Sequence, residues 1–134
     1  PIAWAVGHPK TLARLAEVPR RQPAGGSVAA ALATFDDLDW VMAMVRRVRE
    51  ERSRLYRMLR KLNMVQPLPS WAGFLLTRVE RGDAGLVADA LAERGILVAR
   101  PDSPELGNYL RVSAGRPEDT DALRKALIEI GLLI

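Results

Sequence analysis

The sequence contains no cysteine, which excludes disulfide bonds, thiolate metal sites and cysteine nucleophiles. Its one histidine, His8, has no second imidazole with which to share a metal ion. Aromatic residues make up 5% of the chain and are not interleaved with the basic residues, as a surface for stacking bases would require. No apolar run is long enough to cross a bilayer. We therefore expect no metal site, no nucleic-acid partner and no membrane contact. The lack of cysteine permits a cytoplasmic location, which we predict.

What the sequence does contain is typical of one globular domain. It has 134 residues, of which 49% are hydrophobic and 27% are charged, with a net charge of +4. The chain begins at Pro1 rather than at a methionine, and Pro1–Val6 has the character of a strand that starts abruptly. From this opening we expect the sequence to be part of a longer protein.

The stretch from Asn108 to Gly115 alternates between two sets of side chains. One set is apolar and the other contains Tyr109, Arg111 and Ser113, and this period of two is what a β-strand produces. Arg111 stands in the middle of its face, and a buried guanidinium without an anionic partner is very costly. Two interpretations stay open from the residues alone. Arg111 is either a solvated surface arginine or a binding group whose planar fork of donors fits a carboxylate.

The amino-terminal half of the chain is predicted to be helical. A helix over residues 9–18 begins at a proline, with His8 as a surface or capping residue at its start. An alanine-rich helix is expected over residues 27–35. Asp36 is expected to cap a long helix over residues 37–62.

The long helix has an apolar stripe and a basic opposite face. Its apolar residues recur at spacings typical of an amphipathic helix. The basic residues are Arg46, Arg47, Arg49, Arg54, Arg57, Arg60 and Lys61. Three helical ion pairs are expected to offset part of this charge: Arg46–Glu50, Arg47–Glu51 and Glu50–Arg54. We favour a solvated helix face, and a nucleic-acid-binding face is the alternative.

The second half of the chain predicts the order β-α-β-β-α. Strands are expected over residues 73–79, 96–100 and 108–115, and helices over residues 84–94 and 117–130. The first strand is apolar on both faces and is therefore expected to be buried. We predict an α+β fold of two layers, with long amino-terminal helices followed by a small domain whose three-stranded sheet is mainly antiparallel. The helices would cover one face of the sheet and leave the face of Arg111 open to another domain.

Three blocks follow one another along this region: residues 71–76 (WAGFLL), 92–98 (AERGILV) and 109–119 (YLRVSAGRPED). In order and spacing they resemble the carboxyl-terminal small domain of class I/II pyridoxal-phosphate aminotransferases of fold type I, and in particular the histidinol-phosphate aminotransferase-like members. The helix around Arg49–Leu55 and the segment Trp4–Pro9 also resemble parts of this family. The likeness therefore covers almost the whole chain.

The resemblance implies a site. In that family the arginine of the Leu-Arg-Val-Ser-x-Gly block binds the α-carboxylate of the amino-acid substrate, which assigns this role to Arg111. Pyridoxal-phosphate chemistry needs a lysine amine. The family's Ser-x-Ser-Lys loop would precede Pro1, whereas Lys10, Lys61 and Lys125 lie in other contexts. We expect the intact enzyme to use pyridoxal 5'-phosphate, and this chain alone to have no catalytic residue, no cofactor and no activity.

The resemblance also predicts the organisation of the chain. Residues 1–35 would be a remnant of the large-domain edge with linker helices, and residues 36–134 the small domain of a transaminase that is homodimeric when intact. Its substrates would be amino acids and 2-oxo acids. The sequence departs from the family at Gly73, where the family has asparagine, at Pro23–Gly25 and at Trp4, which leaves the exact substrate open.

Two alternatives remain. One is a threonine-phosphate decarboxylase-like enzyme, and the other is a cofactor-free regulatory or nucleic-acid-binding domain. A carboxylate of the chain itself that sealed Arg111 in the interior would contradict the substrate role.

Overall fold

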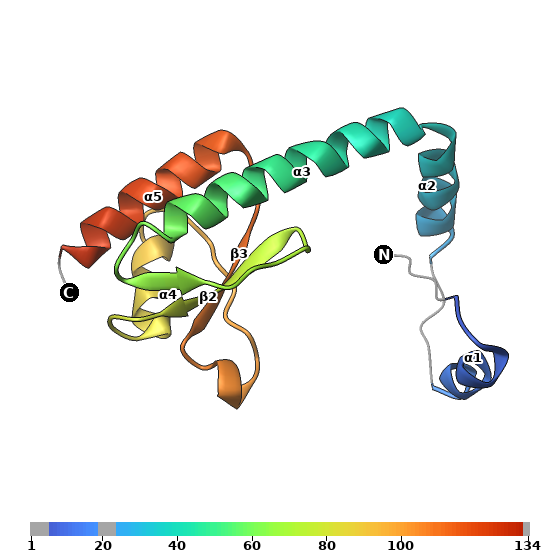
Figure 1. Cartoon of the computed structure of the whole chain (residues 1–134), viewed down its shortest axis with the longest axis horizontal. Coiled ribbons are helices and arrows are strands. Elements are labelled where there is room, and N and C mark those ends of the chain that lie inside the picture. Colours follow the sequence, from blue (N-terminus) through green and yellow to red (C-terminus); the bar gives the residue numbers. More distant parts are fainter. Residues whose placement is uncertain (1–5, 19–23, 133–134) are drawn as a thin grey trace. The chain divides into compact units, whose positions relative to one another are not determined.

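The computed structural model describes residues 6–18 and 24–132. The elements in chain order are α1 (Pro9–Ala16), α2 (Gly25–Asp36), α3 (Leu38–Leu59), β1 (Val65–Pro67), β2 (Phe74–Val79), α4 (Ala84–Ala92), a 3-10 turn (Pro104–Leu106), β3 (Tyr109–Ser113) and α5 (Pro117–Gly131) (Figure 1). The chain divides into two compact units, Pro1–Ala43 and Met44–Ile134. The predicted functional boundary between residues 35 and 36 stays a prediction. The strand predicted for Pro1–Val6 falls largely outside the described residues.

The first unit contains α1, α2 and the start of α3. The helix α1 begins where predicted, because Nδ1 of His8 accepts a hydrogen bond from the backbone N–H of Lys10 at 3.3 Å, and Pro9 occupies the first helical turn. His8 is therefore the capping residue that the sequence indicated.

The start of α3 differs from the prediction by one residue. Asp36 is the last residue of α2, so it is not free to cap the next helix. Asp37 has non-helical backbone angles, and its carboxylate accepts a hydrogen bond from the Trp40 N–H at 3.2 Å. Asp37 rather than Asp36 is the cap of α3.

The second unit is built on a three-stranded antiparallel sheet in the order β1-β2-β3. The register places Leu76 opposite Arg111 and Phe74 opposite Ser113. The predicted fold class, with helices first and a mainly antiparallel three-stranded sheet later, is confirmed. The strands that make up the sheet are not all the predicted ones.

Two segments differ from the prediction. No strand was predicted over residues 65–67, yet they pair with β2 as an edge strand, where the missing N–H of Pro67 is tolerated. Residues 96–100 were expected to be a strand, but they form only an isolated bridge between Ala99 and Arg111. The Ile96 N–H is used to close the end of α4 on the Leu91 carbonyl at 3.0 Å. Pro101 then removes the next donor, so too little backbone remains for a ladder.

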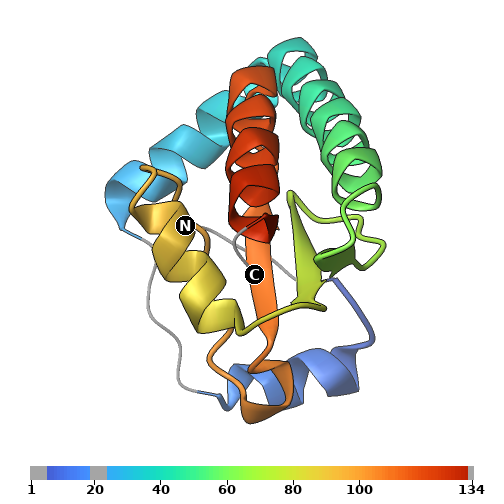
Figure 2. The same cartoon turned by 90° about the vertical axis from the view of Figure 1, so that its left-hand side faces the viewer.

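The helices of the second unit cover one face of this sheet. Figure 2 shows α5 lying between α3 and α4. The core includes buried apolar side chains from these helices and from alternate strand positions: Leu55, Leu59, Val65, Leu75, Val79, Val87, Leu91, Leu110, Val112, Leu123, Leu127 and Ile130. Burial of this apolar surface is the main force that holds the two layers together.

The opposite face of the sheet is not covered by the helices of the second unit. Its side chains are half-buried or exposed: Gln66, Phe74, Leu76, Arg78, Tyr109, Arg111 and Ser113. The predicted openness of the Arg111 face is therefore observed in this unit. The prediction that β2 is buried on both faces is wrong, because its second face consists of Phe74, Leu76 and the exposed Arg78.

The predicted charge pairing on α3 is also wrong. Arg54 forms ion pairs with Glu51 at 3.0 Å and with Asp121 of α5, and none of the three expected pairs forms among the described residues. Glu51 does not lie on the solvated face, because it is only 7% exposed. Both differences arise because α5 packs over this part of α3: it buries Glu51 and brings Asp121 to Arg54.

Within the described ranges, no helix is both long enough and apolar enough to span a bilayer.

Candidate functional site

Arg111 lies in the middle of β3, and its backbone is held from both sides. It pairs with Leu76 of β2 in the antiparallel register. On the other side its N–H donates to the Ala99 carbonyl at 2.7 Å, and its own carbonyl accepts from the Ala99 N–H at 3.1 Å. A residue paired with neighbours on both sides has a fixed backbone position, so the side chain leaves the sheet from a defined point.

The two ends of β3 are anchored by side chains that bond to backbone groups. At its start, the Asn108 amide donates to the Val79 carbonyl at 2.7 Å and its oxygen accepts from the Ala84 N–H at 2.9 Å. Just after its end, the Asp119 carboxylate accepts from the Arg116 N–H at 2.9 Å. This bond, followed by the contact with the Arg116 guanidinium, lowers the pKa of Asp119 below its ordinary value.

The Arg111 side chain is exposed and contacts an aromatic ring. Its guanidinium carbon lies over the ring of Phe74, 5.2 Å from the ring centre. This is a cation–π distance. In the part of the chain that the structure describes, Arg111 has no acidic partner. The carboxylate that would have contradicted a binding role is absent from these residues.

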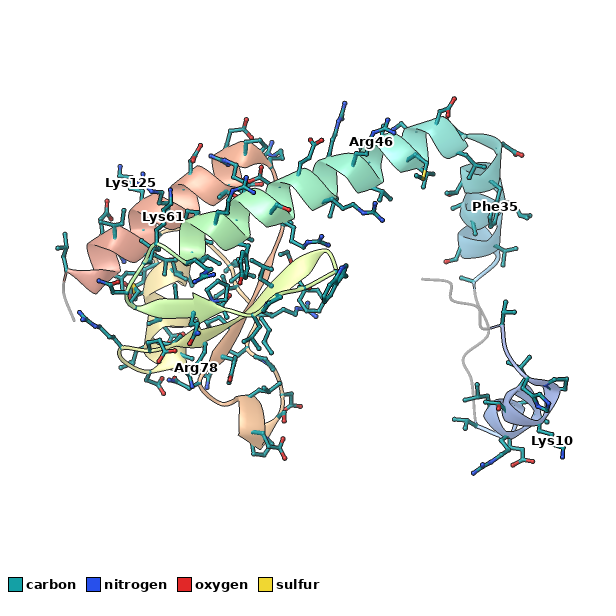
Figure 3. All side chains as sticks on the ribbon, in the orientation of Figure 1. Lys10, Phe35, Arg46, Lys61, Arg78 and Lys125 are labelled. Carbon is teal, nitrogen blue, oxygen red and sulfur yellow. The ribbon has the colours of Figure 1, made fainter. Side chains whose placement is uncertain are left out.

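A second arginine on the same face, Arg78, has a guanidinium whose donors are engaged by neighbouring side chains. Arg78 donates to Glu80 at 2.9 Å and to Gln66 at 3.1 Å, so an acidic neighbour and an amide engage it. Figure 3 shows Arg78 on the side of the sheet away from the helical layer. Both arginines share a face and a sheet, but only Arg111 keeps its donors free. Arg111 is therefore the group on this face that can bind an anion.

The two lysines of the second unit, Lys61 and Lys125, lie away from Arg111. Lys61 follows α3 and Lys125 belongs to α5, and Figure 3 places both with the helices that cover the other face of the sheet. Lys10 lies on α1 in the first unit. Within residues 6–18 and 24–132, no group of acidic and histidine side chains could hold a metal ion. Lys61 and Lys125 of the second unit lie away from the face that carries Arg111.

The profile of the family described as Aminotransferase class I and II matches residues 2–127. The chain belongs to this family. A curated relative, the histidinol-phosphate aminotransferase of Dehalococcoides mccartyi, is 44% identical over 103 residues, which are 77% of this chain and 29% of the relative. The chain spans only 29% of the length of this relative, and 36% of the length of the histidinol-phosphate aminotransferase of Roseiflexus castenholzii.

Solved structures of this family have the same fold. The histidinol-phosphate aminotransferase of Sinorhizobium meliloti, solved in complex with pyridoxal-5'-phosphate, matches 80% of this chain with a TM-score of 0.70 and 28% identity, and 30% of that chain is covered. The L-threonine-O-3-phosphate decarboxylase of Porphyromonas gingivalis matches 66% of this chain with a TM-score of 0.60 and 25% identity, and 28% of that chain is covered. The resemblance first inferred from the sequence blocks is confirmed.

Two features of the site were not predicted from the sequence. The contact between Phe74 and Arg111 depends on the register of two strands that are far apart along the chain. The bridge to Ala99 was expected as a full strand. The alternation of residues 109–113 did place the Arg111 side chain on the open face. The position of Arg111 was therefore predicted correctly from the sequence pattern.

Proposed function

We propose that this chain is the carboxyl-terminal part of a pyridoxal-phosphate-dependent aminotransferase similar to histidinol-phosphate aminotransferase. In that enzyme Arg111 binds the α-carboxylate of the amino-acid or 2-oxo-acid substrate. The observation that carries the proposal is an exposed guanidinium on an open sheet face with its N–H donors free of acidic neighbours. Membership of the family supports the reaction class.

The proposal divides the work between this chain and the rest of the enzyme. The lysine and the phosphate-binding groups belong to residues outside this chain, and the chain alone is inactive. Residues 36–134 form the small domain and residues 1–35 belong to the edge of the large domain. A cytoplasmic homodimer remains a prediction from the resemblance, as does the absence of a nucleic-acid partner.

The test compares two arginines on the same face in the full-length enzyme loaded with pyridoxal phosphate. Arg111→Ala should raise the KM for 2-oxoglutarate by about 30-fold or more, because a charged hydrogen-bonded pair is lost. Binding of pyridoxal phosphate, measured by its absorbance, should be unchanged. Arg78→Ala is the matched control and should leave this KM within about twofold of the parent, since it removes only a surface ion pair. Equal loss of cofactor and substrate binding in Arg111→Ala would contradict the assigned role.

A second candidate function is the decarboxylation of a phosphorylated amino acid. The match to the threonine-phosphate decarboxylase structure favours it. The two reactions give different products from the same enzyme preparation. Release of carbon dioxide from L-threonine O-3-phosphate without any 2-oxoglutarate would support the decarboxylase. Formation of glutamate that requires 2-oxoglutarate would support the aminotransferase.

A further inference from the structure

We propose that Phe74 is a positioning residue that holds the Arg111 guanidinium ready for a substrate carboxylate. This inference rests on the proposed function, because it gives Arg111 a carboxylate to bind. The supporting observation is the 5.2 Å separation between the guanidinium carbon of Arg111 and the centre of the Phe74 ring. The ring is attached to β2, so it reaches Arg111 from the neighbouring strand.

The chemistry of the contact suits a binding arginine. An acidic neighbour would hold the guanidinium firmly, but it would also occupy N–H donors and cancel the charge, as Glu80 does for Arg78. An aromatic face attracts the cation through its quadrupole, without serving as a hydrogen-bond acceptor for the donors at the guanidinium edge. The contact therefore restricts the side chain and leaves those donors available for a planar carboxylate. Less rotamer freedom then has to be lost when the substrate binds.

The register explains why Phe74 fills this role. Leu76 stands directly opposite Arg111, and Phe74 stands opposite Ser113, one pair further along the same face. Diagonal neighbours in a sheet lie within reach of long and aromatic side chains. The small side chain of Ser113 does not compete for the space between them. Tyr109 is the other aromatic residue on this face, but its partner across the strands is Arg78.

The backbone makes the contact rigid. The strand β3 is paired with β2 on one side and bridged to Ala99 at Arg111 on the other, so the ring and the guanidinium start from fixed positions. Neither side chain has to be held by a loop. The positioning is therefore a property of the sheet itself.

The test uses the full-length enzyme, with 2-oxoglutarate as the probe. Phe74→Leu removes the ring and should raise the KM for 2-oxoglutarate by about two- to fivefold, the range expected for an exposed cation–π contact. The kcat and the binding of pyridoxal phosphate should not change. Phe74→Tyr keeps the ring and should restore the parent KM. Tyr109→Leu is the matched control, since it removes a ring from the same face without altering the Phe74 contact.

A second readout does not depend on turnover. NMR relaxation of the Arg111 Nε–Hε group should show increased motion in Phe74→Leu and parent-like motion in Phe74→Tyr. Unchanged motion and an unchanged KM in Phe74→Leu, with a raised KM in Arg111→Ala, would overturn the inference and leave the proposed function standing. An equal rise in KM in Phe74→Leu and Phe74→Tyr would also overturn it, because the ring would then be irrelevant. An unchanged KM in Arg111→Ala would refute the proposed function itself.

Discussion

Glu51 of α3 and Thr120 of α5 are joined by a buried hydrogen bond, in which the Thr120 hydroxyl donates to the Glu51 carboxylate. Arg54 extends this link by donating to Glu51 at 3.0 Å and to the Pro117 carbonyl at 2.9 Å. The hydrogen bond to Glu51 is the largest cause that raises the pKa of Arg54 above its ordinary value. These contacts fix α5 against α3, and α5 directly follows the strand that carries Arg111. The helical layer is thus tied to the strand that presents the candidate binding group.

Thr120→Val should test this link. The substitution removes the hydroxyl donor and leaves the buried Glu51 carboxylate with one partner fewer. We expect the free energy of unfolding to fall by about 1–3 kcal/mol, the usual cost of leaving a buried polar group short of a partner. Chemical denaturation measures this change. No loss of stability would mean that the bond contributes nothing in the native state.

Thr77→Val is the matched substitution, with the opposite expected sign. Thr77 is 1% exposed, and its hydroxyl oxygen has no hydrogen-bond partner among the described residues. Replacing that hydroxyl by a methyl group removes a buried polar group that has no hydrogen bond to offset its desolvation. We expect the free energy of unfolding to rise by about 1 kcal/mol. If Thr77→Val and Thr120→Val both destabilised the protein equally, the effect would come from packing and not from hydrogen bonding.

Asp119 should give the stability a pH dependence in the acid range. Its pKa is lowered, first by the hydrogen bond from the Arg116 N–H and then by the Arg116 side chain. A lowered pKa in the folded state means that the stabilisation is complete above the unfolded pKa and disappears as the pH falls through the folded pKa. Asp119→Asn should therefore lower the Tm at neutral pH, and the gap from the parent should close as the pH falls below the ordinary pKa of an aspartate carboxyl group. A Tm gap that stays constant over this range would show that the charge of Asp119 is not involved.

Local signals in the sequence predicted local structure well. The alternation around Arg111 defined β3 and its open face. Asp83, directly before α4, caps that helix by accepting from the Gly85 N–H at 2.7 Å and from the Leu86 N–H at 3.1 Å. Gly95 ends that helix with a φ of 75°, a conformation that glycine adopts without strain. Each of these features depends on neighbours within a few residues. These features are therefore determined by the local sequence that forms them.

Features that depend on distant segments were not predicted. Glu51 looked like a surface partner for Arg47, and only the packing of α5 shows that it is buried. Arg78 and Arg111 both sit on strands of one face, and only the register reveals that one is paired while the other contacts Phe74. Helical spacing and strand alternation say which way a side chain points. They do not say which other element it meets.

Gly73 should accept a side chain, although the family resemblance leads one to expect asparagine there. A Cβ built at Gly73 would have only Val48 Cγ1 within 4 Å, at 3.8 Å, which is ordinary contact. Gly73→Ala should therefore raise the free energy of unfolding by about 0.4–1 kcal/mol, because alanine reduces the conformational entropy of the unfolded chain. Gly73→Asn should not lower the Tm. Gly115→Ala is the contrasting control, because its Cβ would lie 2.7 Å from Asp119 Oδ2 and displace the cap of α5. Thermal denaturation should show a lower Tm for Gly115→Ala only. A lower Tm in Gly73→Asn would mean that the fold itself requires glycine at position 73.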